Sequence, residues 1–255
     1  MFLSPCIEWQ FAEEHAEMPD RIRAAKAAGF DSVEFHLWRD KDIGGIAAAL
    51  AETGVRLTGI CVDPRRSLVD PAQHGEFLDA VRDSLVAARQ LGSPPMIVAS
   101  GFTREGVDAQ DHFDAAVAVL TQAAALAEAA AVMLVLEPLN DRVEHPGMYL
   151  VSTALGLDIV AAVASPNLRL LFDVYHSATM GEDMEQVLTG RMHLVHHVQL
   201  ADMPGRNEPG SGTLDWGKVI AVLERLGYDG GIGLEYRPTM PALQSLAQTR
   251  AVLGL

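Results

Sequence analysis

The sequence predicts a closed (β/α)8 barrel, in which a ring of parallel strands is covered by helices. Strand-like and helix-like segments alternate along the whole chain of 255 residues. The strand-like segments are almost continuously apolar, as expected for parallel strands that are buried on both faces. A doubly wound open sheet usually carries GxGxxG after its first strand, and this chain has none. We therefore expect a single barrel domain over residues 1–255.

Eight segments are expected as strands because each is apolar and of strand length. In order they are 2–7, 31–38, 55–63, 94–101, 132–140, 168–176, 194–202 and 230–236. The segments between them are expected as helices because their apolar residues recur at helical spacing. These helices are 18–30, 43–54, 76–92, 113–130, 153–165, 184–192 and 216–228.

Helix-end signals support several of these boundaries. Asp20 is an acid in the first turn of the first helix, where the helix dipole favours negative charge. Gly29, Gly54 and Gly92 mark the ends of the first three helices, because glycine is the usual residue at a helix C-terminus. The Ala-rich run AAALAEAAAVMLVL is interrupted by Glu128 and is interpreted as the end of a helix followed by a strand.

Composition narrows the partners and the compartment. With 19 basic and 34 acidic residues, the chain has a net charge of −15, which disfavours binding to nucleic acid. Its two cysteines, Cys6 and Cys61, lie in apolar stretches and form no disulfide framework, which is typical of the reducing cytoplasm. The N-terminus does not resemble a signal peptide, and no apolar run reaches the roughly 20 residues of a membrane span. We expect a cytoplasmic protein with a small-molecule substrate. Homo-oligomerisation stays open.

Polar residues end four of the apolar strands, and active sites of such barrels lie at the C-terminal ends of the strands. These residues are Glu137, Asp173, Gln199 and Glu235, on the fifth to eighth strands. Taken singly, each glutamate is equally compatible with an ion pair to a neighbouring Arg or Lys. Together, three carboxylates on one face would repel each other without a cation between them. Carboxylate and amide oxygens suit a hard divalent cation, so we predict a metal site here.

Further candidates lie near these strand ends. His176 follows Asp173 by three residues and is expected to hydrogen-bond a substrate hydroxyl, with a loop cap as the less favoured alternative. Arg206 offers a planar fork that suits a carboxylate, and the alternative is a pair with Glu208, which can also orient it. Glu34 is expected to bind substrate or to anchor a loop at the early strands.

Strand alternation predicts which histidines face the barrel interior, and the tryptophans are candidates for packing positions. His196 and His197 must face opposite sides of their strand, and His197 is in phase with Gln199, so it is the one expected to point into the barrel. His193 is expected outside. His36 is interpreted as packing at the rim. Trp9 and Trp38 are candidates for the wall of a pocket, and Trp216 is expected to pack at the start of a helix.

The motifs FDVYH, HVQLADMPGRNEP, the following G-x-x-D-W and GLEY resemble the hydroxypyruvate isomerase group of the xylose isomerase-like TIM barrels. The combination of H-V-Q with R-x-E-P is the most specific part, whereas VEFHLW and LEPLN match less specifically. The resemblance spans the whole chain. The opening FLSPCIEWQF differs from the shorter polar opening expected of that group, so the early loops that select the substrate are expected to differ.

The resemblance implies a site and a reaction. It implies that four residues bind the metal, namely Glu137, Asp173, Gln199 and Glu235, with Mg²⁺ or Mn²⁺ as the expected ion. It implies substrate contacts from His176 and Arg206, and an acid/base pair formed by Glu137 and Glu235. The expected reaction interconverts a small keto/aldehyde pair through an enediolate. Hydroxypyruvate and tartronate semialdehyde, or a related sugar acid, are the expected pair.

Other activities on the same barrel stay open. A ketose 3-epimerase uses the same two-glutamate logic, but such enzymes usually have histidine where this chain has Gln199, as the resemblance implies. An inosose dehydratase-like enzyme is a further relative. A non-catalytic sugar-binding barrel is less favoured. A zinc endonuclease is also less favoured, because it needs many histidine ligands and tolerates strong negative charge poorly.

Overall fold

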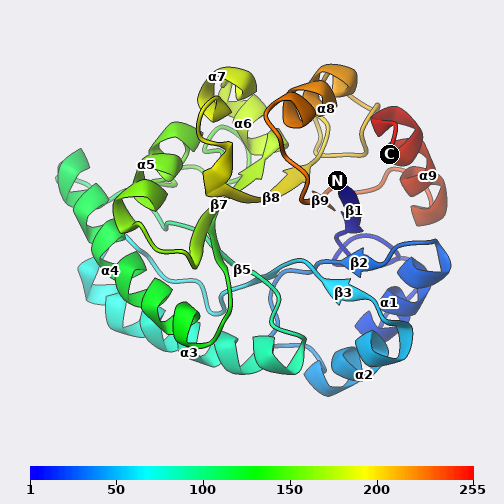
Figure 1. Cartoon of the computed structure of the whole chain (residues 1–255), viewed down its shortest axis with the longest axis horizontal. Helices are drawn as coiled ribbons and strands as arrows, with labels where there is room; N and C mark the ends of the chain where they lie inside the picture. Colours follow the sequence, from blue (N-terminus) through cyan, green and yellow to red (C-terminus); the bar gives the residue numbers. More distant parts are fainter.

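The computed structural model, which describes residues 1–255, places parallel strands in a ring with helices around it (Figure 1). The strands are β1 (Phe2–Pro5), β2 (Ser32–Val33), β3 (Arg56–Leu57), β4 (Ile60–Cys61), β5 (Met96–Val98), β6 (Leu134–Leu136), β7 (Leu168–Asp173), β8 (Val195–Leu200) and β9 (Gly231–Leu234). All of their pairings are parallel. The predicted barrel is confirmed.

The barrel closes through its first strands. One seven-stranded sheet runs in the order β1-β9-β8-β7-β6-β5-β4, and β2 pairs with β3. An isolated parallel bridge between Cys6 and Glu34 joins the end of β1 to the end of β2. β3 and β4 follow one another along the predicted third strand, separated by Thr58 and Gly59. Thr58 N donates to Val33 O, and Phe35 N donates to Gly59 O, so this interruption stays bonded to β2.

Nine helices surround the strands, as Figure 1 shows. They are α1 (Met18–Ala27), α2 (Ile43–Thr53), α3 (His74–Gln90), α4 (Ala109–Ala129), α5 (Thr153–Val163), α6 (Val174–Met180), α7 (Met184–Leu188), α8 (Trp216–Arg225) and α9 (Ala242–Leu253). Side chains cap several of them, since Asp42, Ser152 and Asp215 each accept a hydrogen bond from a backbone N–H in the first turn. None of the helices combines the length and the apolar character that a membrane crossing needs.

Two of these helices were not predicted. The strand predicted over 168–176 ends at Asp173, and α6 begins there because the Asp173 carboxylate accepts a hydrogen bond from Tyr175 N at 2.8 Å. α9 buries Ser245 and Thr249, both of which contact the Tyr236 hydroxyl. These polar positions weaken the apolar spacing that marks a helix in sequence.

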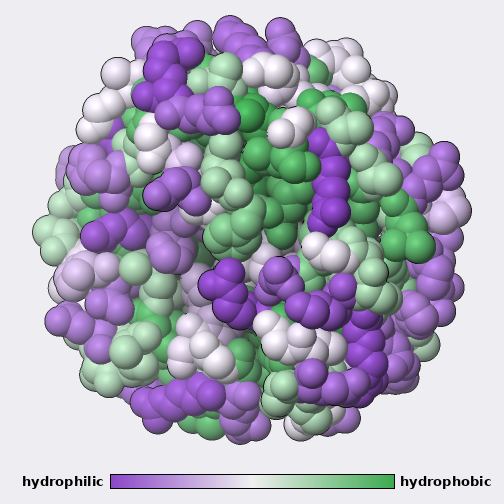
Figure 2. All heavy atoms as spheres, turned by 45° about the vertical axis from the view of Figure 1, so that its right-hand side comes forward, coloured by the Kyte–Doolittle hydropathy of each residue, from purple (hydrophilic) through white to green (hydrophobic).

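The hydrophobic core has two parts. A large cluster of 56 buried residues fills the space around the strands and under the helices. A small cluster inside the barrel consists of Cys61, Ile97, Val135 and Leu171, on four successive strands. Both cysteines are buried free thiols. On the face shown in Figure 2, hydrophilic and hydrophobic residues are mixed over the surface.

Candidate active site

A cavity of about 320 Å³ opens at the C-terminal ends of the strands. Glu137 and Glu235 line it from the late strands, and Trp9 and His36 line it from the early ones. Cys61 and Ile97 of the small apolar cluster lie against it, so part of its wall is apolar. Such a concave, partly apolar site with a few convergent polar groups is typical of small-molecule binding.

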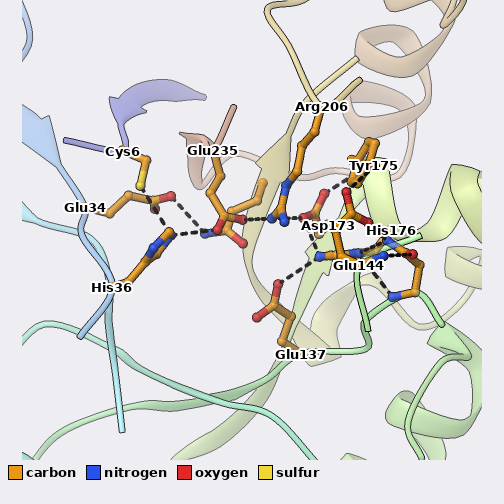
Figure 3. Close-up of polar contacts among 12 residues, drawn as sticks. Cys6, Glu34, His36, Glu137, Glu144, Asp173, Tyr175, His176, Arg206 and Glu235 are labelled. Atoms are coloured by element: carbon orange, nitrogen blue, oxygen red, sulfur yellow. Dashed lines mark hydrogen bonds and ion pairs between the residues drawn. The ribbon is translucent and has the colours of Figure 1, made fainter. Parts of the chain in front are cut away.

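The late strands bring the four predicted residues to one end of the barrel. Asp173 ends β7 and is in register with Gln199 on β8, which is in register with Gly233 on β9. Glu137 follows β6 directly, and Glu235 follows β9 directly. All four side chains are buried. Figure 3 shows Glu137, Asp173 and Glu235 gathered around the tip of Arg206.

Arg206 lies between two of the carboxylates. Its Nη2 is 2.8 Å from Glu235 Oε2 and 3.6 Å from Asp173 Oδ2. The Trp9 and Tyr175 rings also contact its guanidinium, and the centroid of each ring lies 5.3 Å from Arg206 Cζ. Arg206 therefore supplies part of the positive charge that the sequence argument assigned to a metal alone. The suggested Arg206–Glu208 pair is wrong, because the Glu208 carboxylate instead accepts hydrogen bonds from the backbone N and the hydroxyl of Thr239.

Burial and neighbouring charges give the three carboxylates different pKa values. Burial, followed by the charges of Glu235 and Asp173, raises the pKa of Glu137 well above its usual value. Burial raises the pKa of Asp173 to about 7, although Arg206 opposes the rise. Burial acts on Glu235 in the same direction, but Arg206 and His36 outweigh it and hold its pKa below the usual range. The negative charge of the cluster is therefore concentrated on Glu235, beside the arginine.

The donor atoms left over in this cluster fit a divalent cation. Asp173 Oδ2 and Gln199 Oε1 are buried and accept no hydrogen bond. One ligand atom each from Glu137, Asp173 and His176 lies within 4.8 Å of the others. Buried acceptors without donors are unfavourable unless a ligand satisfies them. Oxygen donors of this kind suit Mg²⁺ or Mn²⁺ chemically.

His176 is arranged as a hydrogen-bond donor rather than a ligand. Its Nδ1 accepts a hydrogen bond from Asn140 N at 3.1 Å, so in the neutral ring the proton is on Nε2. Burial and then Arg206 hold the pKa of His176 well below its usual value, which keeps the ring neutral. Nε2 has no hydrogen-bond partner and lies 3.5 Å from Asp173 Oδ2. The predicted contact to a substrate oxygen fits this free N–H.

Glu34 does not line the cavity, and neither do Asp173 and Gln199. Its Oε1 accepts a hydrogen bond from Gln199 Nε2 at 2.9 Å, and its Oε2 is 2.7 Å from His197 Nε2. The prediction that His197 points inward while His196 is exposed is confirmed. A carboxylate can only accept here, so the amide of Gln199 must turn its N–H₂ group to Glu34 and its oxygen away. The expected direct contact of Glu34 with substrate therefore has no support in its position.

Gly233 provides the room that Glu34 needs. A Cβ atom at Gly233 would lie 2.4 Å from Glu34 Oε1 and 2.6 Å from Glu34 Oε2. No side chain can occupy that space without moving the carboxylate. The glycine in GLEY thus accommodates a residue that lies about two hundred positions earlier in the chain.

Several cavity residues were missed in the sequence. His36, interpreted as rim packing, places Nε2 2.7 Å from Glu235 Oε1, and its ring meets Trp9 edge-on. Its alternation with Glu34 along one strand would have placed both on the inner face. Arg65 and Arg237 also line the cavity, and they carry no signal because both lie on loops. Trp38, a candidate for the wall, instead bonds Ser84 and does not line the cavity.

Comparison with known proteins gives the family. A family model described as xylose isomerase-like TIM barrel matches residues 22–253. The hydroxypyruvate isomerase of Escherichia coli is 29% identical over 225 residues, which cover 86% of this chain and 87% of the relative. The 2-oxo-tetronate isomerase of Cupriavidus necator is 30% identical over 248 residues, which cover 94% and 95% of the two chains.

Solved structures agree with this fold. A structure described as AP endonuclease, family 2 from Brucella melitensis superposes with a TM-score of 0.90 at 28% identity and covers 98% of this chain and 99% of the other. D-psicose 3-epimerase from Clostridium cellulolyticum has a TM-score of 0.82 at 20% identity, with 99% of each chain covered, and this likeness shows the fold alone. From the extent of the family match and the barrel geometry together, the chain belongs to the xylose isomerase-like TIM barrel family.

Proposed function

We propose that this isomerase interconverts a small hydroxy-keto acid and its aldehyde isomer, with hydroxypyruvate and tartronate semialdehyde as the leading pair, and that it uses a divalent cation. Two relatives support this proposal, a hydroxypyruvate isomerase that is 29% identical to this chain and a 2-oxo-tetronate isomerase that is 30% identical. Both names denote isomerases of small oxo acids, which supports the same class of substrate here.

One observation carries the proposal. Two buried oxygens at neighbouring strand ends, Asp173 Oδ2 and Gln199 Oε1, accept no hydrogen bond and adjoin two buried glutamates. In an isomerase site, oxygens of this kind bind a cation, and glutamates beside it carry protons. Glu137, Asp173, Gln199 and Glu235 would hold the ion. When bound, the ion would act as a Lewis acid that makes the carbon-bound proton of the substrate more acidic.

The chain's own residues would move the proton. One of the two glutamates, Glu137 or Glu235, takes the proton from the hydroxymethyl carbon of hydroxypyruvate, which leaves an enediolate. The same or the other glutamate then returns a proton to the neighbouring carbon, while the hydroxyl proton passes from one substrate oxygen to the other. His176 Nε2–H is placed to donate to a substrate oxygen. The aromatic rings of Trp9 and Tyr175 hold Arg206 in place beside Glu235.

The experiment follows proton exchange. The protein is incubated with hydroxypyruvate in deuterated water, with Mg²⁺ or Mn²⁺ or after treatment with a chelator, and NMR follows deuterium at both carbons. We expect deuterium incorporation and aldehyde formation with metal, and neither after chelation. If no hydroxy-keto acid exchanges in the presence of either metal, the proposal is wrong.

The same NMR measurement with a ketose in place of hydroxypyruvate tests the epimerase alternative, which the sequence left open. An epimerase returns the proton to the carbon from which it came, so it exchanges deuterium and inverts that centre without moving the carbonyl. Gln199 favours the isomerase, because the resemblance implies histidine at that position in the epimerases. Inversion without carbonyl migration on a ketose would decide for the epimerase.

A further inference from the structure

Arg65 is a cation at the cavity that has no acidic partner. The chain has 34 acidic and only 19 basic residues, and two of the arginines that line the cavity pair with a carboxylate. The neighbouring Arg66 does so, with Nε 2.5 Å from Glu76 Oε2. Arg206 does so with Glu235. Arg65, in contrast, forms no ion pair, although it lines the cavity.

Of the cavity's other arginines, Arg66 and Arg206 pair with carboxylates, whereas Arg237 forms no ion pair and contacts an aromatic ring. Arg206 is held by Glu235 and Asp173, so its guanidinium has little capacity left for the carboxylate of a substrate. Arg237 lies over the Trp9 ring, with Cζ 5.6 Å from the centroid. Arg65 lies near Cys61 in the cavity wall, where burial raises the pKa of the thiol to about 12 and Arg65 opposes that rise.

The loop that carries Arg65 is firmly anchored, although the arginine itself is exposed at the mouth. Asp63 N donates to Ser84 Oγ at 3.0 Å on one side of Arg65, and Leu68 N donates to Ser100 O at 2.9 Å on the other. Leu68 and Val69 are fully buried. Arg66 Nη1 donates to Arg65 O at 2.9 Å. The backbone that carries Arg65 is therefore held in place, which lowers the entropic cost of ordering the loop when a ligand binds.

We propose that Arg65 binds the carboxylate of the substrate and makes the cavity selective for hydroxy-keto acids over neutral ketoses. The inference rests on the proposed function for the reaction but not for the binding. An arginine fork pairs with a planar carboxylate through two parallel hydrogen bonds, which a neutral hydroxymethyl group cannot reproduce. Arg65 would thereby supply the charge recognition that sequence reasoning gave to Arg206.

Two matched ligand pairs test it. Hydroxypyruvate and dihydroxyacetone differ only by carboxylate against hydroxymethyl and are compared by turnover. D-glycerate and glycerol differ in the same way, do not react, and are compared by calorimetric or NMR titration. In Arg65→Gln we expect the KM of hydroxypyruvate and the Kd of glycerate to rise roughly 10- to 100-fold, the range for a lost charge-assisted hydrogen bond. Values for the neutral partners should change less than about 2-fold.

Control variants identify the cause. Arg82→Gln removes the same charge from an exposed ion pair on α3, outside the cavity, and should leave all four constants unchanged. Arg65→Lys should recover part of the preference for the acids, because it restores the charge without the fork. Equal weakening of acid and neutral ligands in Arg65→Gln, or equal effects of Arg82→Gln, would overturn the assignment.

The binding arm separates this inference from the proposed function. If neither substrate is turned over but glycerate binding still depends on Arg65, the isomerase proposal fails and the carboxylate site stands. If hydroxypyruvate is isomerised but glycerate and glycerol bind equally to the unaltered protein, the carboxylate site is overturned and the isomerase proposal stands.

Discussion

The late half of the barrel, β6 to β9, differs from the early half, β1 to β4, in the length of its strands and in the kind of residue that it places near the cavity. β7 and β8 have six residues each, and with β6 and β9 they place buried oxygens at the strand ends. β2, β3 and β4 have two residues each, and the loop after β4 carries Arg65. Strand ends are more rigid than loops, so the late half suits proton transfer, whereas the early half suits substrate recognition.

The largest expected effect tests the late half. Glu137→Gln and Glu235→Gln each remove a carboxylate that we propose to carry the proton, while keeping its shape. Each should lower the rate of deuterium exchange about 10²- to 10⁴-fold, the usual contribution of general acid–base catalysis. NMR exchange under saturating substrate measures it. Glu182→Gln, a carboxylate bonded to Thr153 and Ser177 instead, is the control. Near-normal exchange in either variant would remove that glutamate from the pair.

The next effect crosses the two halves. Glu34 lies on the early side but fixes the amide of Gln199 on the late side. In Glu34→Gln the new side-chain amide can donate as well as accept a hydrogen bond, so it no longer forces the Gln199 oxygen to turn away from it. We expect about 10- to 100-fold weaker binding of Mn²⁺ by calorimetric titration, the range for residues that orient metal ligands. Glu182→Gln again serves as control, and unchanged Mn²⁺ affinity would leave Glu34 with a packing role only.

A smaller effect is expected at His36, the other early residue that contacts a late carboxylate. His36→Asn removes the contact to Glu235 Oε1, but Arg206 stays on Oε2. Loss of one charge-assisted hydrogen bond should lower kcat about 10-fold with little change in KM. The exposed His193→Asn is the matched control. A change in KM alone would instead place His36 among the recognition residues.

The smallest effect concerns stability. Gly233→Ala puts a methyl group against Glu34 and should lower the free energy of unfolding by about 1–3 kcal/mol, the usual cost of overpacking. Gly75→Ala, where an added Cβ meets no atom within 4 Å, should change it by less than about 0.5 kcal/mol. Urea unfolding of both variants measures the difference. Equal stability would mean that Glu34 moves without cost.

The sequence predicted the late half better than the early half. Apolar strands that end in an oxygen-bearing residue can be recognised directly in the sequence. The structure places four such residues at or next to the C-terminal ends of β6 to β9, namely Glu137, Asp173, Gln199 and Glu235. The contact of His36 with Glu235 spans 199 positions, and that of Arg206 spans 29. Periodicity tells which face a residue occupies, but not how far a long side chain reaches across a barrel. Arg65 lies on a loop, where no period applies.

Arg206 has a consequence for how the protein is assembled in the cell. Its guanidinium already neutralises part of the acidic cluster, so the barrel can reach its native shape before any ion arrives. This differs from small metal-dependent domains, in which the ion drives folding. If the proposed cation is required for activity, its removal would therefore leave a folded, inactive protein whose activity returns when the ion is added back.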